Sequence, residues 1–118
     1  MAENIVKSKS FAFAVKIVNT YKQLAFKQKE FVLSKQVLRS GTSVGAMIRE
    51  AEHAESKADF QHKLAIAQKE INETIYWLEL LHETKYLTPS LFQELHNDAK
   101  ELIRLLTAIL KTSKLRKN

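Results

Sequence analysis

The sequence predicts an all-α protein, folded as an antiparallel up-down-up-down four-helix bundle. There are two glycines and one proline in 118 residues, which leaves few breaks for strands and turns. Apolar residues instead recur in steps of three and four, the spacing of one helical face. The connections between the helical segments are short, so successive helices should run antiparallel. With 45% hydrophobic residues, we expect residues 1–118 to form a single domain with a real core.

The first helix is expected over about residues 8–28. One face carries an apolar set and a second set lies beside it: Phe11, Ala14, Val15, Val18, Tyr21 and Ala25, then Phe13, Ile17 and Leu24. Together they span an arc of about 200°, whereas packing against a single core requires a stripe of ~100°. We therefore expect this helix to contact something on a second side.

The second helix is expected over about residues 34–54. It directs one apolar stripe inward: Val37, Gly41, Val44, Ile48 and Ala51. Gly41 and Gly45 are the only glycines in the chain, and a glycine inside a helix costs roughly 0.5–1 kcal/mol relative to alanine. The two lie on neighbouring turns and share a surface of small residues with Ser40, Ser43 and Ala46. We expect that the close approach of another helix compensates for the cost of these two glycines.

The third and fourth helices each follow a capping signal. Ser56, with Asp59 three residues later, should cap a helix over about residues 57–85. Thr88 followed by Pro89 should start a helix over about residues 89–113, because proline is favoured at the first helical position. The expected inward stripes are Phe60, Leu64, Ala67, Ile71, Ile75 and Leu78 in the third helix, and Phe92, Leu95, Ala99, Leu102, Leu106 and Ile109 in the fourth. The basic tail, residues 111–118, should be frayed.

Charge is divided unevenly along the chain. The net charge is +6, but residues 1–49 hold nine Lys/Arg against two acids, whereas residues 50–110 hold six against eleven. Two interpretations are open: basic and acidic faces that meet within or between subunits, or a basic surface left open for nucleic acid. A solvated, lysine-rich exterior without a partner is the simpler alternative.

Composition disfavours several classes of protein. The chain has no cysteine, and therefore neither a disulfide framework nor a thiolate metal site. Its first residues have no apolar signal-peptide core, and no apolar run approaches the ~20 residues of a membrane span. No Gly-rich phosphate loop or nucleophile elbow is present. We expect a soluble, cytoplasmic protein with no membrane partner.

Two Glu-x-x-His pairs, Glu50…His53 and Glu79…His82, raise the remote alternative of a ferritin-like di-metal bundle. Such a site needs one more carboxylate from each of the other two helices, and the first helix has no acid between Asn4 and Lys29. Glu50 and His53 also fall opposite the apolar stripe of their helix. We expect no metal, no cofactor and no catalytic residue.

A distinctive pattern of small, apolar and charged residues occupies positions 38–81. It comprises Leu38-Arg39-Ser40-Gly41-Thr42-Ser43-Val44-Gly45-Ala46, Ile48-Arg49-Glu50-Ala51, Ser56-Lys57-Ala58-Asp59-Phe60, Lys63–Glu70, Glu73-Thr74 and Tyr76-Trp77-Leu78. With this pattern the chain resembles the four-helix-bundle proteins of the 23S rRNA-intervening-sequence family, which are related to the accessory variability determinant proteins of diversity-generating retroelements. One position differs, because the family commonly has Asn where this chain has Met47.

The resemblance implies a bacterial protein without known catalysis, encoded inside a large ribosomal RNA gene or standing alone. Members of the family form five-subunit rings, so it also implies a homopentamer. The retroelement members bind nucleic acid and a reverse transcriptase through basic surface. RNA or DNA, and a reverse transcriptase or another protein, are therefore the candidate partners, besides further copies of the chain.

Candidate residues for nucleic acid lie on the first two helices. Lys9, Lys16 and Lys27 fall within about 20° of one another on the first helix, at 100° per residue. Arg39 and Arg49 lie off the core face of the second helix. We expect these five residues to contact phosphates mainly as charges, with little preference for sequence.

Candidate interface residues lie on the second and third helices: Gly41, Gly45, Ile66, Tyr76, Trp77 and Leu80. Trp77 would be a half-exposed rim residue in a monomer and an anchor in an oligomer, and we favour the anchor. We thus predict a non-enzymatic, oligomeric protein, a pentameric ring, that binds nucleic acid or acts as an adaptor. The alternative is a protein-interaction scaffold that binds no nucleic acid.

Overall fold

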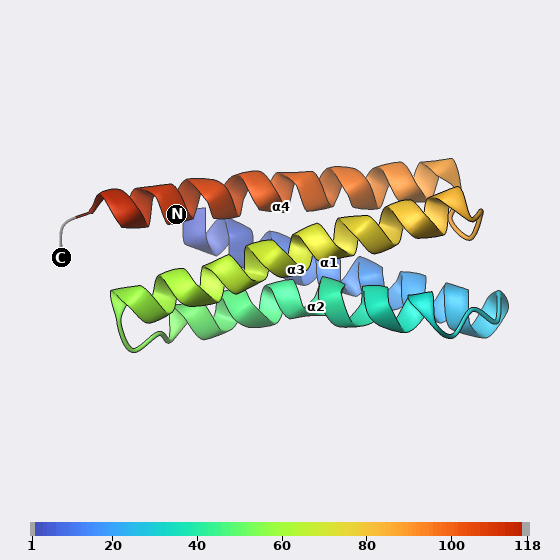
Figure 1. Ribbon diagram of the computed structural model, residues 1–118, viewed down its shortest axis with the longest axis horizontal. Helices are drawn as coiled ribbons and strands as arrows, with labels where there is room; N and C mark the ends of the chain where they lie inside the picture. The colour runs from blue at the N-terminus through green and yellow to red at the C-terminus, as the bar shows by residue number, and fades with distance from the viewer. Residues whose placement is uncertain (1, 117–118) are drawn as a thin grey trace.

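The computed structural model describes residues 2–116, and this part of the chain is a four-helix bundle without strands, as predicted. Four α-helices and one π-helical turn form it: α1 (Ala2–Lys22), η1 (Gln23–Lys27), α2 (Leu33–Glu52), α3 (Lys57–Glu83) and α4 (Pro89–Leu115). The bundle measures 50 × 22 × 19 Å, and the two connections 28–32 and 84–88 lie at the end opposite the chain termini (Figure 1). Within residues 2–116 no helix combines the length and apolar character that crossing a bilayer requires.

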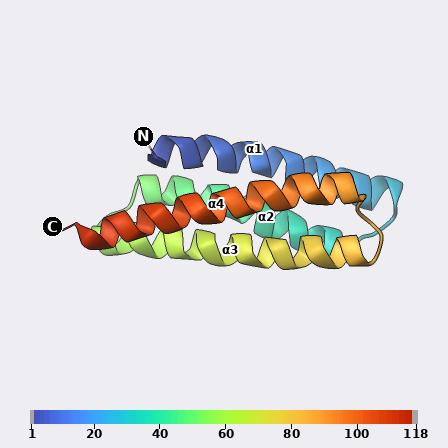
Figure 2. The ribbon, with the colours of Figure 1, turned by 90° about the horizontal axis from the view of Figure 1, so that it is seen from above.

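Each helix packs against two others. α1 and α3 both contact α2 and α4, so α1 and α3 are diagonal partners in the bundle. Figure 2 shows this arrangement, with α1 and α3 at opposite edges and the other two helices between them. The outer faces of α1 and α3 therefore point in opposite directions.

Three helix boundaries differ from the predicted ones in ways that matter. α1 begins at Ala2 instead of about residue 8, because Val6 continues its buried face. It ends in the π-turn η1, where the Gln28 N–H donates to the Gln23 carbonyl at 3.1 Å. α4 runs on to Leu115, since Leu110 and Ser113 are buried. The prediction of a frayed tail from residue 111 is therefore wrong for residues 111–115, and residues 117–118 lie outside the described part.

The second of the two apolar sets on the first helix forms its core face. Phe13, Ile17 and Leu24 are buried, whereas Phe11 is 57% and Val15 46% exposed. The sequence left the choice open because polar residues also occupy the buried face. Ser10 and Thr20 are buried, and their hydroxyls donate to backbone carbonyls of the same helix, at Lys7 and Lys16.

The other predicted stripes and both caps are confirmed. All five inward residues of α2 are buried, and so are the predicted stripes of α3 and α4, except that Phe60 and Phe92 are partly buried. The Ser56 side chain accepts from the Asp59 N–H at 3.0 Å. The Thr88 side chain accepts from the Leu91 N–H at 3.2 Å, with Pro89 in the first turn. These caps satisfy N–H groups that have no partner inside their own helix.

The two glycines of α2 lie under α1. A Cβ atom on Gly41 would come within 2.9 Å of the Ile17 side chain, a distance that the buried isoleucine does not allow. A Cβ atom on Gly45 would meet Ser10 at 3.5 Å, an ordinary contact. Gly41 is thus required by the contact between α1 and α2 inside one chain, and the contact at Gly45 is looser.

Candidate nucleic-acid interface

Two of the predicted phosphate-binding lysines are ion-paired with α4. Lys9 Nζ lies 3.3 Å from Glu101, and Lys16 Nζ lies 2.9 Å from Glu94 and 2.7 Å from Asp98. The hydrogen bond to Asp98, followed by the one to Glu94, raises the pKa of Lys16 above its usual value. These side chains lie on one face, as predicted, but that face meets an acidic face of the same chain.

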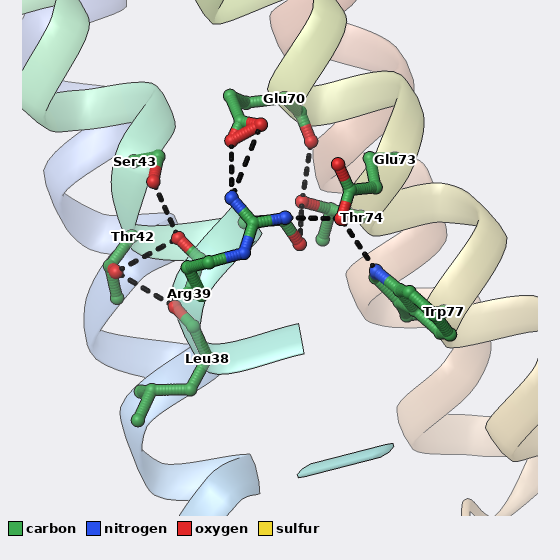
Figure 3. A network of polar contacts seen from close by, with 9 residues as sticks. Leu38, Arg39, Thr42, Ser43, Glu70, Glu73, Thr74 and Trp77 are labelled. Carbon is green, nitrogen blue, oxygen red and sulfur yellow. Dashed lines mark hydrogen bonds and ion pairs between the residues drawn. The ribbon is translucent and has the colours of Figure 1, made fainter. Parts of the chain in front are cut away.

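Arg39 joins α2 to α3 in the same way. Its guanidinium donates to Glu70 at 2.9 Å and also forms an ion pair with Glu73 (Figure 3). Glu70 is only 8% exposed, so the pair is partly shielded from water on the carboxylate side. The hydrogen bonds to Glu73 and Glu70 raise the pKa of Arg39. Lys7 pairs with Glu52 at 3.0 Å as a further link between α1 and α2.

Trp77, the predicted anchor, belongs to the same network. Its indole N–H donates to Glu73 Oε2 at 3.0 Å, the same oxygen that Arg39 contacts (Figure 3). The hydrogen bond from Trp77 lowers the pKa of Glu73 most, and the hydrogen bond from Arg39 lowers it further. Tyr76 packs edge-on against Trp77 with ring centroids 5.0 Å apart and is itself exposed. Ile66 and Leu80 are half-buried on the same helix. Their role in a subunit interface stays a prediction.

The remaining two predicted residues are in different surroundings. Arg49 lies over the exposed ring of Phe11, 5.4 Å from its centroid, in a cation–π contact. Lys27 lies in the π-turn η1, where residues are not spaced at the 100° of an α-helix. The predicted alignment of Lys27 with Lys9 and Lys16, which assumed that spacing, therefore does not hold. Within residues 2–116 neither cation has a carboxylate within ion-pair distance.

A basic stripe on α4 was missed by the sequence analysis. Lys100, Arg104, Lys111 and Lys114 are exposed, and they fall within about 80° on the outer side of the helix at 100° per residue. Among the residues that the structure describes, no carboxylate pairs with them. The signal was present as helical spacing. It was hidden because residues 50–110 are acidic on average and the last basic residues were read as a tail.

A second unpaired basic region lies at the end of the bundle, between α1 and α2. We call it the tip, and it consists of Phe26, Lys27, Lys29, Phe31 and Val32. Its apolar side chains are well exposed: Phe26 by 63%, Phe31 by 52% and Val32 by 72%. Lys27 and Lys29 are exposed between them. The sequence analysis singled out only Lys27 of these residues.

A buried glutamate holds the backbone of the tip. The Glu30 carboxylate accepts from the N–H groups of Val32, Leu33 and Ser34, at 3.2, 3.0 and 2.6 Å. It thereby caps α2, whose N-cap residue Val32 makes no side-chain cap of its own. The Ser34 hydroxyl donates back to the Glu30 carbonyl at 2.7 Å. The side-chain amide of Gln28 donates to the backbone carbonyl of Tyr86 at 2.9 Å and links the tip to the 84–88 connection.

The two Glu-x-x-His pairs are not brought together. Glu50 forms an ion pair with Lys63, while His53 is an exposed residue at the end of α2. The ring of His82 stacks on Phe92 with centroids 4.2 Å apart. Within residues 2–116 no cluster of three or more His, Asp or Glu side chains is placed to hold a metal ion. The geometry of this region therefore offers structural contacts and no ligand set.

The fold and its surface define a class of protein: a small antiparallel four-helix bundle whose helices are joined by ion pairs, with a stripe of unpaired cations along α4. The chain belongs to the family of 23S rRNA-intervening sequence proteins, whose family model matches residues 2–108. It is also similar to a crystal structure of a protein of unknown function from the S23 ribosomal protein family of Bacteroides thetaiotaomicron, with 59% identity and a TM-score of 0.93. That similarity covers 94% of this chain and 99% of the other. No curated protein matches the chain.

Proposed function

We propose that this protein is a non-enzymatic nucleic-acid-binding adaptor that works as a homo-oligomer, a pentameric ring. The observation that carries the proposal is the distribution of unpaired charge. Ion pairs inside the chain occupy Lys7, Lys9, Lys16 and Arg39. The cations without a carboxylate partner, in the described part, include a continuous stripe on the outer face of α4 and the two lysines of the tip.

Such a surface suits a polyanion more than an acidic protein. The stripe on α4 is made of long, flexible side chains without an apolar centre: Lys100, Arg104, Lys111 and Lys114. Contacts of this kind give affinity through release of counterions from phosphates and carry little sequence information. In an oligomer the stripe is repeated in every copy, so that several weak contacts act together on one strand.

Binding of labelled RNA and DNA, measured by fluorescence anisotropy over a series of salt concentrations, tests this function. We expect the logarithm of the affinity to fall linearly with that of the salt concentration, by roughly 0.7–0.9 per neutralised phosphate. Changing Lys100, Arg104 and Lys111 to glutamine should lower both affinity and slope. The matched control is Lys9→Gln with Lys16→Gln, which removes two lysines already paired with acids. The absence of binding by the unaltered protein at low salt would contradict the proposal.

The oligomer has a separate test in the molar mass of the protein in solution, measured by light scattering. A mass of five chains is expected, and that of one chain would contradict it. Purified protein should also contain no stoichiometric iron, manganese or zinc by elemental analysis. Two metal ions per chain, lost on changing His53 and His82 to alanine, would overturn the non-enzymatic proposal.

A second candidate function, a protein-interaction scaffold without nucleic acid, is favoured by the exposed apolar face of α1. Phe11 and Val15 are exposed there beside Arg49. This candidate predicts that Phe11→Ser with Val15→Ser lowers the oligomeric mass while the unaltered protein binds no nucleic acid at any salt concentration.

A further inference from the structure

We propose that the tip binds single-stranded nucleic acid, with bases stacking on Phe26 and Phe31 and phosphates contacting Lys27 and Lys29. This inference rests on the proposed function. It names the form of nucleic acid that the protein takes and the surface that takes it, which is distinct from the stripe on α4. Its support comes from ring exposure, from the rigidity of the backbone and from the charge around the rings.

The two phenylalanine rings are exposed, Phe26 by 63% and Phe31 by 52%. Immediately before Phe26, Leu24 and Ala25 are both buried, whereas Phe26, in the π-turn, is exposed. The Phe26 ring is held edge-on by Tyr21, with centroids 6.1 Å apart. Phe26, Phe31 and Val32 are exposed within seven residues of one another, and exposed apolar side chains that lie together, rimmed by polar residues, indicate a binding surface.

The backbone that carries the rings is rigidly held. Lys29 has a φ of 60°, a left-handed conformation that a residue other than glycine adopts at a cost. The three N–H groups on the Glu30 carboxylate and the bond from Gln28 to Tyr86 hold this conformation in place. Because the rings sit on an ordered loop, a ligand that stacks on them meets a preformed surface and loses little affinity to ordering.

Every charge that the tip turns to solvent is positive. Glu30 is the only acid between Glu3 and Glu50, and it is 9% exposed because its carboxylate points into the backbone of the α2 start. Lys27 and Lys29 lie between Phe26 and Phe31 along the chain. The backbone extends by at most ~3.6 Å per residue, so the two rings and the two lysines are close enough to contact one short oligonucleotide.

The size and chemistry of the tip favour a nucleic acid over a protein or a membrane. Two rings and a valine are far less than the ~800 Å² per partner of a stable protein interface. A peripheral membrane anchor requires a long amphipathic helix or a lipid chain, and the tip is a short loop. Base stacking on aromatic rings beside lysines is the usual way of holding a single strand. A duplex keeps its base faces stacked inside, so the rings have nothing to contact there.

The experiment compares a labelled single strand with a duplex of the same length, by fluorescence anisotropy at one salt concentration. For the unaltered protein we expect tighter binding to the single strand. The variant Phe26→Ala with Phe31→Ala should lose at least about fivefold in single-strand affinity per ring, the equivalent of about 1 kcal/mol, and keep its duplex affinity. Phe31→Ala alone gives the same test with a smaller effect and leaves the Phe26–Tyr21 contact intact.

One control and one further test variant accompany the double phenylalanine variant. Ile5→Ala removes an apolar side chain of similar exposure, 47%, from α1, and should leave both affinities unchanged. Lys27→Gln with Lys29→Gln should lower the salt slope for the single strand by roughly 0.7 per lost phosphate contact. Circular dichroism and light scattering on each variant check helical content and molar mass.

The outcomes separate this inference from the function on which it rests. Nucleic-acid binding that is unchanged in the double phenylalanine variant would overturn the inference and leave the proposed function standing. Binding to phosphatidylserine vesicles in place of the oligonucleotide, or a loss of molar mass in that variant, would overturn it in favour of a membrane or a second copy. No binding of either oligonucleotide by the unaltered protein would overturn both.

Discussion

Lys16, in the middle of α1, and Lys27, in the π-turn that follows α1, lie on one continuous helical segment of the chain, yet only Lys16 faces acids. Lys16 is bonded to Asp98 and Glu94 on α4, whereas Lys27 lies at the tip beside exposed rings. The middle of α1 runs alongside α2 and α4, and the tip projects beyond them. Whether a lysine is a structural contact or an open charge therefore depends on which helix lies opposite it. Four predictions test this contrast, from the largest expected effect to the smallest.

The largest effect is expected where the middle of α1 rests on α2. Gly41→Ala places a methyl group within 2.9 Å of the buried Ile17 side chain. Overpacking of this kind costs about 1–3 kcal/mol, which outweighs the ~0.5–1 kcal/mol that alanine gains in a helix. We expect a net loss of about 1–2 kcal/mol, measured by urea unfolding. Gly45→Ala, whose methyl group has room, should instead stabilise the protein. Equal effects at both positions would contradict the packing described for α1.

At the tip, the largest structural contribution comes from Glu30. Glu30→Ala leaves three N–H groups at the start of α2 without their acceptor. Loss of a helix cap costs about 0.5–2 kcal/mol, and we expect the upper part of this range because the carboxylate is buried. Hydrogen exchange of the amides of residues 32–34 should rise more than that of the middle of α2. An effect on stability without local exchange would place the role of Glu30 elsewhere.

The contrast between the two lysines is tested by a matched pair of substitutions. Lys16→Met removes ion pairs that are partly exposed, so we expect a loss of at most about 1 kcal/mol that shrinks as salt is added. Lys27→Met should leave the free energy of unfolding unchanged at every salt concentration. A destabilising Lys27→Met would show that the tip lysine has a structural role and would weaken the comparison.

The smallest expected effect is a decrease in stability at acidic pH, caused by Glu73 in its network with Arg39 and Trp77. The bonds from Trp77 and Arg39 lower the pKa of Glu73 below its usual 4.5, so its stabilising contribution is fully present above pH 4.5 and is lost as the pH falls through the lowered value. Glu73→Gln should flatten the decrease in melting temperature below pH 4.5. Trp77 is the only tryptophan, so its fluorescence should also shift over that range in the unaltered protein alone. If Glu73→Gln leaves the decrease in melting temperature unchanged, that decrease is caused by other carboxylates.

Much of the fold was predictable because each helix carries its own local signals. The stripes of α2, α3 and α4, the Ser56 cap and the Thr88–Pro89 start depend on residues within a few positions of one another. The boundaries of α1 were less predictable, since its start depends on whether Val6 finds a core to enter, and its end depends on a π-turn that no residue pattern indicates. The buried Ser10 and Thr20 also concealed which of two apolar sets is the core face.

The candidate site was predictable only in part. Charge segregation was visible in the sequence, but the pairing of Lys9, Lys16 and Arg39 joins residues 31 to 92 positions apart, and no spacing rule relates such positions. The stripe on α4 was within reach, because its residues share helical spacing. The tip was harder to predict, since the exposure of Phe31 and Val32 depends on the backbone conformation of the 28–32 connection, which Glu30 holds.

The sequence by itself determined the class of fold, the number and order of the helices and the family, because helical periodicity, caps and the residues at 38–81 are local properties of the chain. The tertiary structure alone decided which cations are neutralised and which aromatic side chains reach the surface. The physical reason is that an ion pair or a buried ring depends on the distance to groups far away along the chain, and only the packing of the helices fixes that distance.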